Sequence, residues 1–159
     1  MAIRLQEVNK DNWQACTKLE PREDQRNFVA PNVYSLAEAR FYPELVPLAV
    51  YDDKALVGFL MWGTDPDEPP GHYWIARMMI DWRQQGKGYG RAAMEAILAD
   101  LKARPDCVVI LLSYHPHNQA AERLYASLGF EKTGEIIGGE VVVRLPVRDT
   151  QQTNGSTSE

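Results

Sequence analysis

The sequence is poor in cysteine and histidine, which limits the metal and redox chemistry open to it. Of its 159 residues, two are Cys and three are His. Cys16 and Cys107 lie far apart, so they form neither a Cys-x-x-Cys pair nor a zinc-ligand spacing. No further ligand accompanies His115 and His117, for which we expect a loop. The sequence therefore predicts reduced, idle thiols and no metal.

The sequence also lacks long apolar runs and an excess of positive charge. No stretch approaches the ~20 apolar residues that span a bilayer, and the charged N-terminus is not typical of a secretory signal. We therefore expect a cytoplasmic protein without a membrane partner. The net charge of −5 disfavours nucleic acid and is compatible with a cationic substrate. The length predicts a single domain, residues 1–147, and the apolar-free segment 148–159 predicts a disordered tail.

Hydrophobic patterning predicts an α/β protein, a mixed sheet of about seven strands with helices on its faces. A Ser35-x-x-Glu38 capping box predicts that a helix begins at Ser35, and Gly129 is expected to end the last helix. The expected strands are 2–8, 47–51, 55–62, 72–81, 107–113, 130–133 and 140–147. The expected helices are 11–19, part of 20–30, a short helix from Ser35 to before Pro43, 88–102 and 118–127.

Three glycines alternate between an apolar strand and an amphipathic helix, at Gly86, Gly88 and Gly90. Glycine permits positive φ and close approach of the backbone to a ligand. The N–H groups and the dipole of a helix's first turn attract anions, and Lys87 and Arg91 add positive charge. This pattern favours a phosphate-bearing ligand. The spacing is neither a Walker A loop nor the Gly-x-Gly-x-x-Gly dinucleotide fingerprint, although a turn that simply needs glycine stays open.

Two motifs resemble the GNAT superfamily of N-acetyltransferases. Residues 79–91 are similar to motif A of that family, in which Gln85, Gly88 and Gly90 take the motif positions. Residues 118–130 are similar to motif B, so the resemblance covers about residues 73–134. A narrower resemblance, carried by 28–35, 79–94 and 134–140, is to the bacterial spermine/spermidine N-acetyltransferases.

The resemblance implies the GNAT fold, with a mostly antiparallel sheet and helices on both faces, and acetyl-CoA as cosubstrate. It implies that Asn118 binds the pantetheine amides, although Asn118 also fits as a helix N-cap. Backbone groups would hold the pantetheine arm at Met78, Met79 and Ile80, and the pyrophosphate at Gln85, Gly86, Lys87, Gly88, Tyr89, Gly90 and Arg91.

Tyr125 is the predicted catalytic residue, because a phenol near the thioester sulfur can donate to the departing CoA thiolate. A core tyrosine is the alternative. Many members of the family carry a base on the strand before motif A, but residues 73–80 contain no carboxylate. A water chain to one of several acidic residues would then accept the amine proton. The candidates are Glu38, Glu140, Asp65, Asp67 and Glu68.

The expected acceptor is a small amine, most simply a polyamine bound by Tyr34, Glu38 and Glu140. Other amines remain open: an aminoglycoside, an amino acid or a protein N-terminus. So does a non-catalytic CoA-binding regulatory module. Relatives of this fold often form homodimers, and nothing in the sequence decides this.

Overall fold

The computed structural model describes residues 1–148, so most of the predicted tail lies outside the described residues. These residues form two compact units, each built from two stretches of chain. The first contains Met1–Gly63 and Ile75–Asp100; the second contains Thr64–Trp74 and the chain from Leu101 onward. That residues 1–147 act as one domain stays a prediction.

The strands form a seven-stranded sheet in the order β1-β2-β3-β4-β5-β7-β6. Strands β4 and β5 pair in parallel. The pairs β1–β2, β2–β3, β5–β7 and β6–β7 are antiparallel, which confirms the predicted mixed sheet. The strands are β1 Ile3–Glu7, β2 Val46–Asp52, β3 Ala55–Gly63, β4 His72–Ile80, β5 Val109–Tyr114, β6 Glu131–Ile137 and β7 Glu140–Pro146. The helices are α1 Trp13–Thr17, α2 Asn32–Phe41, α3 Tyr89–Lys102 and α4 Gln119–Ser127, with 3₁₀ turns η1 Glu23–Gln25 and η2 Trp82–Gln84.

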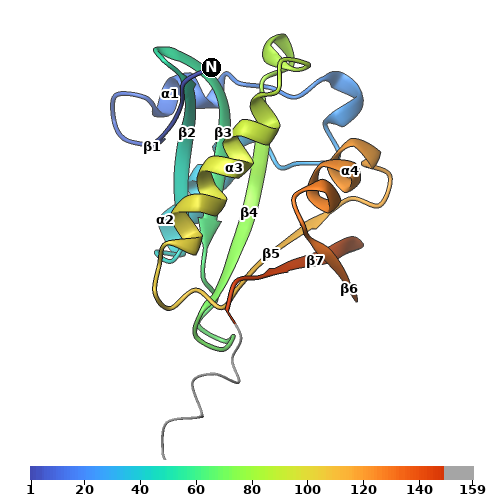
Figure 1. Cartoon of the computed structure of the whole chain (residues 1–159). Coiled ribbons are helices and arrows are strands. Elements are labelled where there is room, and N and C mark those ends of the chain that lie inside the picture. Colours follow the sequence, from blue (N-terminus) through green and yellow to red (C-terminus); the bar gives the residue numbers. More distant parts are fainter. Residues whose placement is uncertain (149–159) are drawn as a thin grey trace, which may run out of the picture. The chain divides into compact units, whose positions relative to one another are not determined.

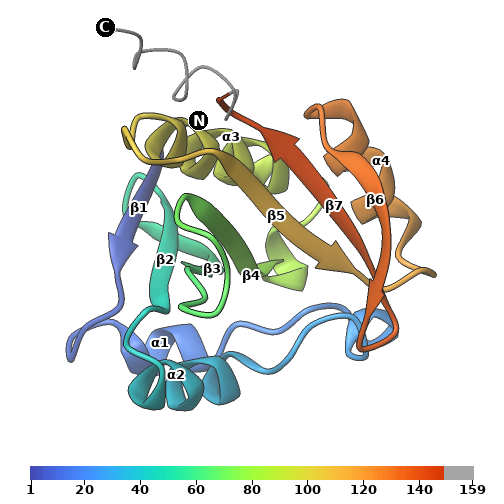
Figure 2. The same cartoon turned by 90° about the horizontal axis from the view of Figure 1, so that it is seen from below.

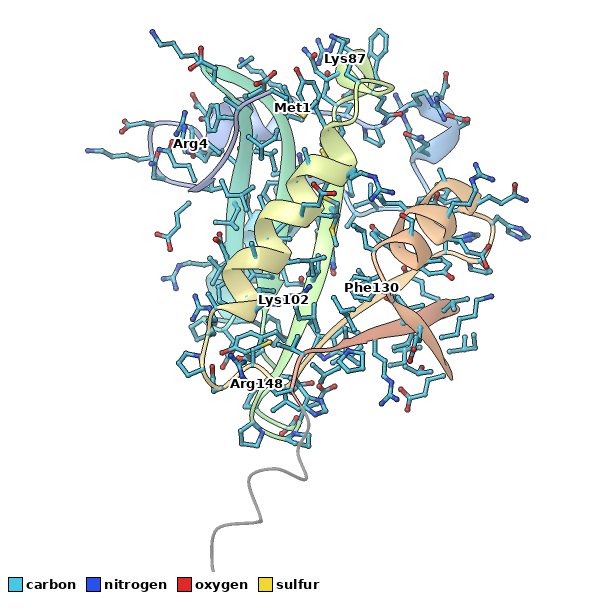
Figure 3. All side chains as sticks on the ribbon, in the orientation of Figure 1. Met1, Arg4, Lys87, Lys102, Phe130 and Arg148 are labelled. Carbon is cyan, nitrogen blue, oxygen red and sulfur yellow. The ribbon has the colours of Figure 1, made fainter. Side chains whose placement is uncertain are left out.

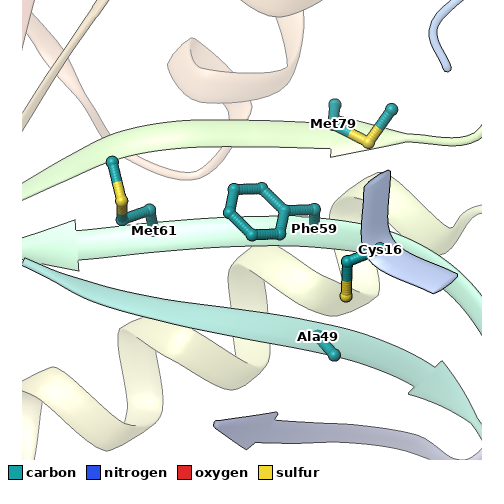
Figure 4. Packing of buried hydrophobic residues seen from close by; sticks show 5 residues of the cluster. All are labelled: Cys16, Ala49, Phe59, Met61 and Met79. Atoms are coloured by element: carbon teal, nitrogen blue, oxygen red, sulfur yellow. The ribbon is translucent and has the colours of Figure 1, made fainter. Parts of the chain in front are cut away.

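In the first unit, α3 covers one face of β2 and β3, and α1 and α2 cover the other (Figure 2). The core under α1 and α2 contains Cys16, Ala49, Phe59, Met61 and Met79 (Figure 4). Strand side chains two apart share a face, which places Phe59 and Met61 together. Burial raises the pKa of the Cys16 thiol to about 11, so this cysteine is a structural thiol, as predicted.

Helix α3 presents an apolar stripe to the opposite face of the sheet. Its five residues at helical spacing are all at least 95 % buried, as the sequence predicted: Ala93, Met94, Ile97, Leu98 and Leu101. Such a stripe is removed from water only when the helix lies along the sheet, as α3 does beside β4 (Figure 1). This packing fixes where the N-terminus of α3 lies relative to β4.

The start predicted for α2 is wrong, because the helix begins at Asn32 rather than Ser35. Pro31 is the N-cap, and its ring fixes the φ that the chain needs to enter the helix. Ser35 is fully buried inside the helix, so the Ser-x-x-Glu pattern is not a capping box here. The side-chain amide of Asn32 instead donates a hydrogen bond of 2.9 Å to the Cys16 carbonyl oxygen, which links α2 to α1.

In the second unit, α4 packs beside β6 and β7 (Figures 1 and 2). Gly129 ends α4 with a φ of 99°, and Gly138 and Gly139 turn β6 into β7 with φ of 57° and 81°. Strand β5 begins at Val109, two residues later than predicted, because the Cys107 amide closes a turn onto the Arg104 carbonyl. Arg148 is the first residue of the predicted tail, yet it lies against the Lys102 end of α3 (Figure 3).

Candidate functional site

The glycine turn joins β4 to α3 in the geometry of an anion site. Gly86 and Gly88 have φ of 80° and 86°, values that L side chains rarely adopt. A Cβ on Gly86 would meet no described atom within 4 Å, so the backbone angle rather than crowding requires glycine. Helix α3 begins at Tyr89, and the first-turn amides of Tyr89 and Gly90 have no intrahelical acceptor. Gly90 itself lies inside the helix.

The two cationic side chains of the turn are accessible. Lys87 is exposed at the tip, beside the N-terminal Met1 (Figure 3), and its ammonium donates to the Gln84 side chain at 3.0 Å. Arg91 forms an exposed ion pair with Glu95 at 3.8 Å. Exposed ion pairs of this kind contribute little to stability, and both Lys87 and Arg91 are exposed to solvent.

The Tyr89 side chain is held by Asp52. Its hydroxyl donates a hydrogen bond of 2.6 Å to Asp52 Oδ2 at the end of β2. The other oxygen, Asp52 Oδ1, accepts a hydrogen bond of 2.9 Å from the Ala2 amide. The bond from Tyr89 is the main reason that the pKa of Asp52 is lowered. Only the backbone amide of Tyr89 therefore suits the role that the sequence predicted.

Asp81 fixes the end of β4 immediately before the turn. The residue is 3 % exposed, and its carboxylate accepts from the Glu20 amide and from the Arg83 guanidinium at 2.8–3.0 Å. Burial by itself raises the pKa of Asp81, but these bonds outweigh it and hold the pKa below its usual value. The carboxylate is therefore ionised at neutral pH and acts as a fixed anchor.

Strand β4 is irregular where the resemblance places the pantetheine arm. Ala76 and Met79 are three residues apart, yet both pack on the core cluster, whereas a regular strand would send them to opposite faces. Met79 and Ile80 are buried, and the Met79 carbonyl passes so close to Gly58 that a Cβ there would be 2.6 Å away. The side chains of Met79 and Ile80 therefore belong to the core, which leaves backbone groups for a ligand.

Arg77 occupies the stretch of β4 that lacks a carboxylate, and sequence reasoning overlooked it. Its Nη2 donates to Glu38 Oε1 of α2 at 3.4 Å, and its Nη1 donates to the Ala76 carbonyl. Its Nε is buried without a protein partner. Tyr34 lies one helical turn before Glu38 and is 57 % exposed. The structure thus brings Tyr34 and Glu38 onto one face of α2, while Glu140 begins β7 in the second unit.

In the second unit, Asn118 is the N-cap of α4, because its Oδ1 accepts from the Ala121 amide at 3.2 Å. Its amide nitrogen is the part that could donate to a ligand carbonyl. Tyr125 is partly buried, with its ring centroid 6.0 Å from those of Tyr114 and Phe130. Burial raises the pKa of Tyr125 to about 12, so this phenol stays protonated throughout the neutral range.

A cavity of about 280 Å³ lies in the first unit beside η1. It was not predicted, because its charged residues are typical of an ordinary solvent-exposed face. The lining residues are Glu20, Pro21, Arg22, Glu23, Arg26 and Trp82. Within residues 1–148, no cluster of His, Cys, Asp and Glu suits a metal ion, and no helix is both long and apolar enough to cross a membrane.

A model of the acetyltransferase (GNAT) family matches residues 5–130 of the chain. The chain belongs to the GNAT family. It is 33 % identical over 148 residues to a spermine/spermidine N(1)-acetyltransferase of Bacillus subtilis, covering 90 % of this chain and 97 % of the relative. The predictions of the family and of an N-acetyltransferase are thereby confirmed.

Two further acetyltransferases are similar to the chain at lower identity. An L-2,4-diaminobutyric acid acetyltransferase of Wolinella succinogenes is 27 % identical over 103 residues, which are 64 % of this chain and 58 % of that protein. A spermidine N-acetyltransferase from Vibrio cholerae, solved in complex with CoA and spermine, superposes with a TM-score of 0.71 at 17 % identity. The superposition covers 89 % of this chain and 92 % of the Vibrio cholerae chain. At this identity the similarity supports the fold alone.

Proposed function

We propose that this GNAT enzyme transfers the acetyl group of acetyl-CoA to a primary amine of a polyamine such as spermidine or spermine. The glycine turn carries the proposal, since it offers first-turn amides and two cations to a diphosphate. The 33 % identity to a spermine/spermidine acetyltransferase across nearly the whole chain supports the acceptor class. The net charge of −5 favours the approach of a polycation.

The proposed contacts with acetyl-CoA are mainly with the backbone. Strand β4 would bind the pantetheine amides through Met78, Met79 and Ile80, in the manner of an added strand. Asn118 would donate from its amide nitrogen while its oxygen continues to cap α4. The residues from Gln85 to Arg91 would surround the pyrophosphate, with Lys87 and Arg91 balancing its charge.

Tyr125 is proposed as the general acid that serves the CoA thiolate, and its pKa defines how it would act. A phenol with a pKa of about 12 is a much weaker acid than a thiol near 8.5. Full proton transfer from Tyr125 to the thiolate is therefore uphill by about 5 kcal/mol. Tyr125 would stabilise the developing thiolate mainly by donating a hydrogen bond as the carbon–sulfur bond breaks. The attacking nitrogen would lose a second proton as the amide forms, and that proton would neutralise the thiolate.

The amine must lose a proton before it attacks, and the acidic candidates mostly have partners already. Glu38 pairs with Arg77, Glu68 accepts from the Trp74 indole at 2.8 Å, and Asp65 accepts from a backbone amide of its own loop. We propose that water takes the proton and carries it to one of these carboxylates. A base in direct contact with the amine is not part of the proposal.

A diamino acid is the second candidate acceptor, and Arg77 favours it. A buried guanidinium Nε without a protein partner suits a carboxylate, which can accept two parallel bonds from such a group. The similarity to a diaminobutyric acid acetyltransferase agrees with this chemistry. In this case Arg77 would hold the acceptor's carboxylate while its side-chain amine is acetylated.

Acetyl-CoA consumption across an acceptor panel tests the proposal. The panel contains spermidine, spermine, 2,4-diaminobutyrate, an aminoglycoside, an amino acid and a peptide with a free N-terminus. We expect the highest kcat/KM with spermidine or spermine. Turnover of another member alone would contradict the polyamine assignment, and binding of acetyl-CoA without turnover of any amine would favour the regulatory module.

A further inference from the structure

We infer that Gln25 is a positioning residue, which fixes the pyrophosphate-binding turn through a paired amide contact with Gln85. The inference rests on the proposed function and deepens it. It concerns a segment between α1 and α2 whose polar composition gives no sign of such a role. Gln25 lies in η1 and is separated from Gln85 by 60 positions in the chain.

The turn needs contacts from another segment because its glycine-rich backbone can adopt many conformations. Gly86 and Gly88 both adopt positive φ, and glycine loses more conformational freedom on ordering than any other residue. Gln85 is the last residue before them, so its position decides where the amides that follow can point. A ligand that ordered this turn by itself would lose binding free energy in doing so.

The two carboxamides pair with each other. Gln85 Nε2 donates to Gln25 Oε1 at 2.8 Å, and Gln25 Nε2 donates back to Gln85 Oε1 at 3.3 Å. Gln85 Nε2 also donates to the Ile80 carbonyl oxygen at 3.0 Å, which closes the turn onto the end of β4. The Gln85 side chain is thus held on one side by its own turn and on the other by Gln25.

Gln25 is itself fixed in place. Its Oε1 also accepts from the Arg22 amide at 3.1 Å, so both lone pairs of this oxygen are used. The same segment binds the turn a second time: the Trp82 amide donates to the Glu20 carbonyl at 2.8 Å, and the Glu20 amide donates to Asp81 Oδ1 at 3.0 Å. Residues 20–25 therefore hold the turn at two points, which favours a turn ordered before the ligand binds.

The variant Gln25→Ala tests the inference when acetyl-CoA is compared with acetyl-pantetheine, a donor that lacks the pyrophosphate. Loss of the hydrogen bonds between Gln25 and Gln85 corresponds to a change in affinity of about 3- to 10-fold. We expect kcat/KM for acetyl-CoA to fall by this factor through KM, while kcat/KM for acetyl-pantetheine is unchanged. Gln25→Glu, which keeps an oxygen that can accept from Gln85, should recover most of the loss. Gln14→Ala, an exposed glutamine of α1, is the matched control.

Equal losses with both donors would overturn the inference, because they would indicate general damage to the fold. No loss with either donor would overturn it as well. Calorimetric titration of CoA separates this result from the proposed function. A wild type that does not bind CoA contradicts both. A wild type that binds CoA no better than Gln25→Ala contradicts the positioning role alone.

Discussion

The Tyr89 hydroxyl donates a 2.6 Å hydrogen bond to Asp52, which joins the first residue of α3 to the end of β2. Because this bond is the largest cause of the lowered pKa of Asp52, Tyr89→Phe should raise that pKa. NMR titration of the Asp52 carboxyl measures the change. The CoA dissociation constant should stay nearly constant, since the proposed contact uses only the residue 89 amide.

The same bond gives a pH dependence of stability. A carboxyl whose pKa is lowered by folding contributes stability that is present above its unfolded pKa, near 3.8, and is lost as the pH falls through the folded pKa. The stability of the wild type should therefore fall more steeply than that of Tyr89→Phe as the pH drops below about 4. Thermal melts from pH 7 to pH 3 measure this, with Tyr42→Phe as the exposed control. Parallel curves would contradict the assignment.

Tyr125→Phe should reduce kcat and leave CoA binding intact. A hydrogen bond to a charged group is worth about 1.5–3 kcal/mol, so kcat should fall by about 10- to 100-fold. Because the pKa of Tyr125 is about 12, the wild-type rate should show no alkaline decline from this group below about pH 11. Tyr114→Phe, which removes the hydroxyl of the neighbouring ring, is the control. An unchanged kcat in Tyr125→Phe would exclude the role in catalysis.

Arg77→Met distinguishes the two acceptor classes. Loss of the guanidinium frees Glu38 from its ion pair and removes a positive charge from β4. KM for spermidine should fall by about 3- to 10-fold if the acceptor is a polycation. If the acceptor is a diamino acid, its KM should instead rise by about 10-fold or more, because the partner of its carboxylate is lost. Steady-state kinetics with both acceptors, with Arg40→Met of α2 as control, decides between them.

Arg148 should contribute to stability although it lies at the end of the described chain. Its guanidinium donates to the carbonyl oxygen of Lys102, the last residue of α3, at 3.3 Å. It also donates to the carbonyl oxygens of Arg104 and Cys107, which follow α3, at 2.7–2.8 Å. Arg148→Ala should lower the free energy of unfolding by about 1–2 kcal/mol. Urea denaturation measures this, with the exposed Arg144→Ala as reference. Equal stability of the two variants would show that these bonds contribute nothing.

The sequence predicted well what depends on periodicity and turn chemistry. The stripe of α3 and the hairpin around Asp53, a residue with φ of 52°, follow from local patterns. The helix cap at Asn118 and the glycine turn also follow from them. The start of α2 does not, because the burial of Ser35 depends on tertiary packing, which can convert a capping pattern into a core position.

The side-chain partners around the site could not be predicted for the same reason. Gln25 and Gln85 are polar residues far apart in the sequence, and nothing local indicates that their amides meet. Arg77 and Glu38 likewise form an ion pair although they are 39 positions apart in the chain. Motifs indicate the backbone that is proposed to bind the cofactor, whereas the contacts proposed to tune the acceptor site arise between segments distant in the chain.

The most direct test of the account is the reaction with spermidine. The purified chain is incubated with acetyl-CoA and spermidine, the free CoA thiol is measured over time, and the polyamine products are identified by mass spectrometry. We predict one CoA thiol released for each N-acetylspermidine formed, with the rate greatly reduced in Tyr125→Phe. Bound acetyl-CoA with no acetylated amine, or equal rates in the two proteins, would contradict the account.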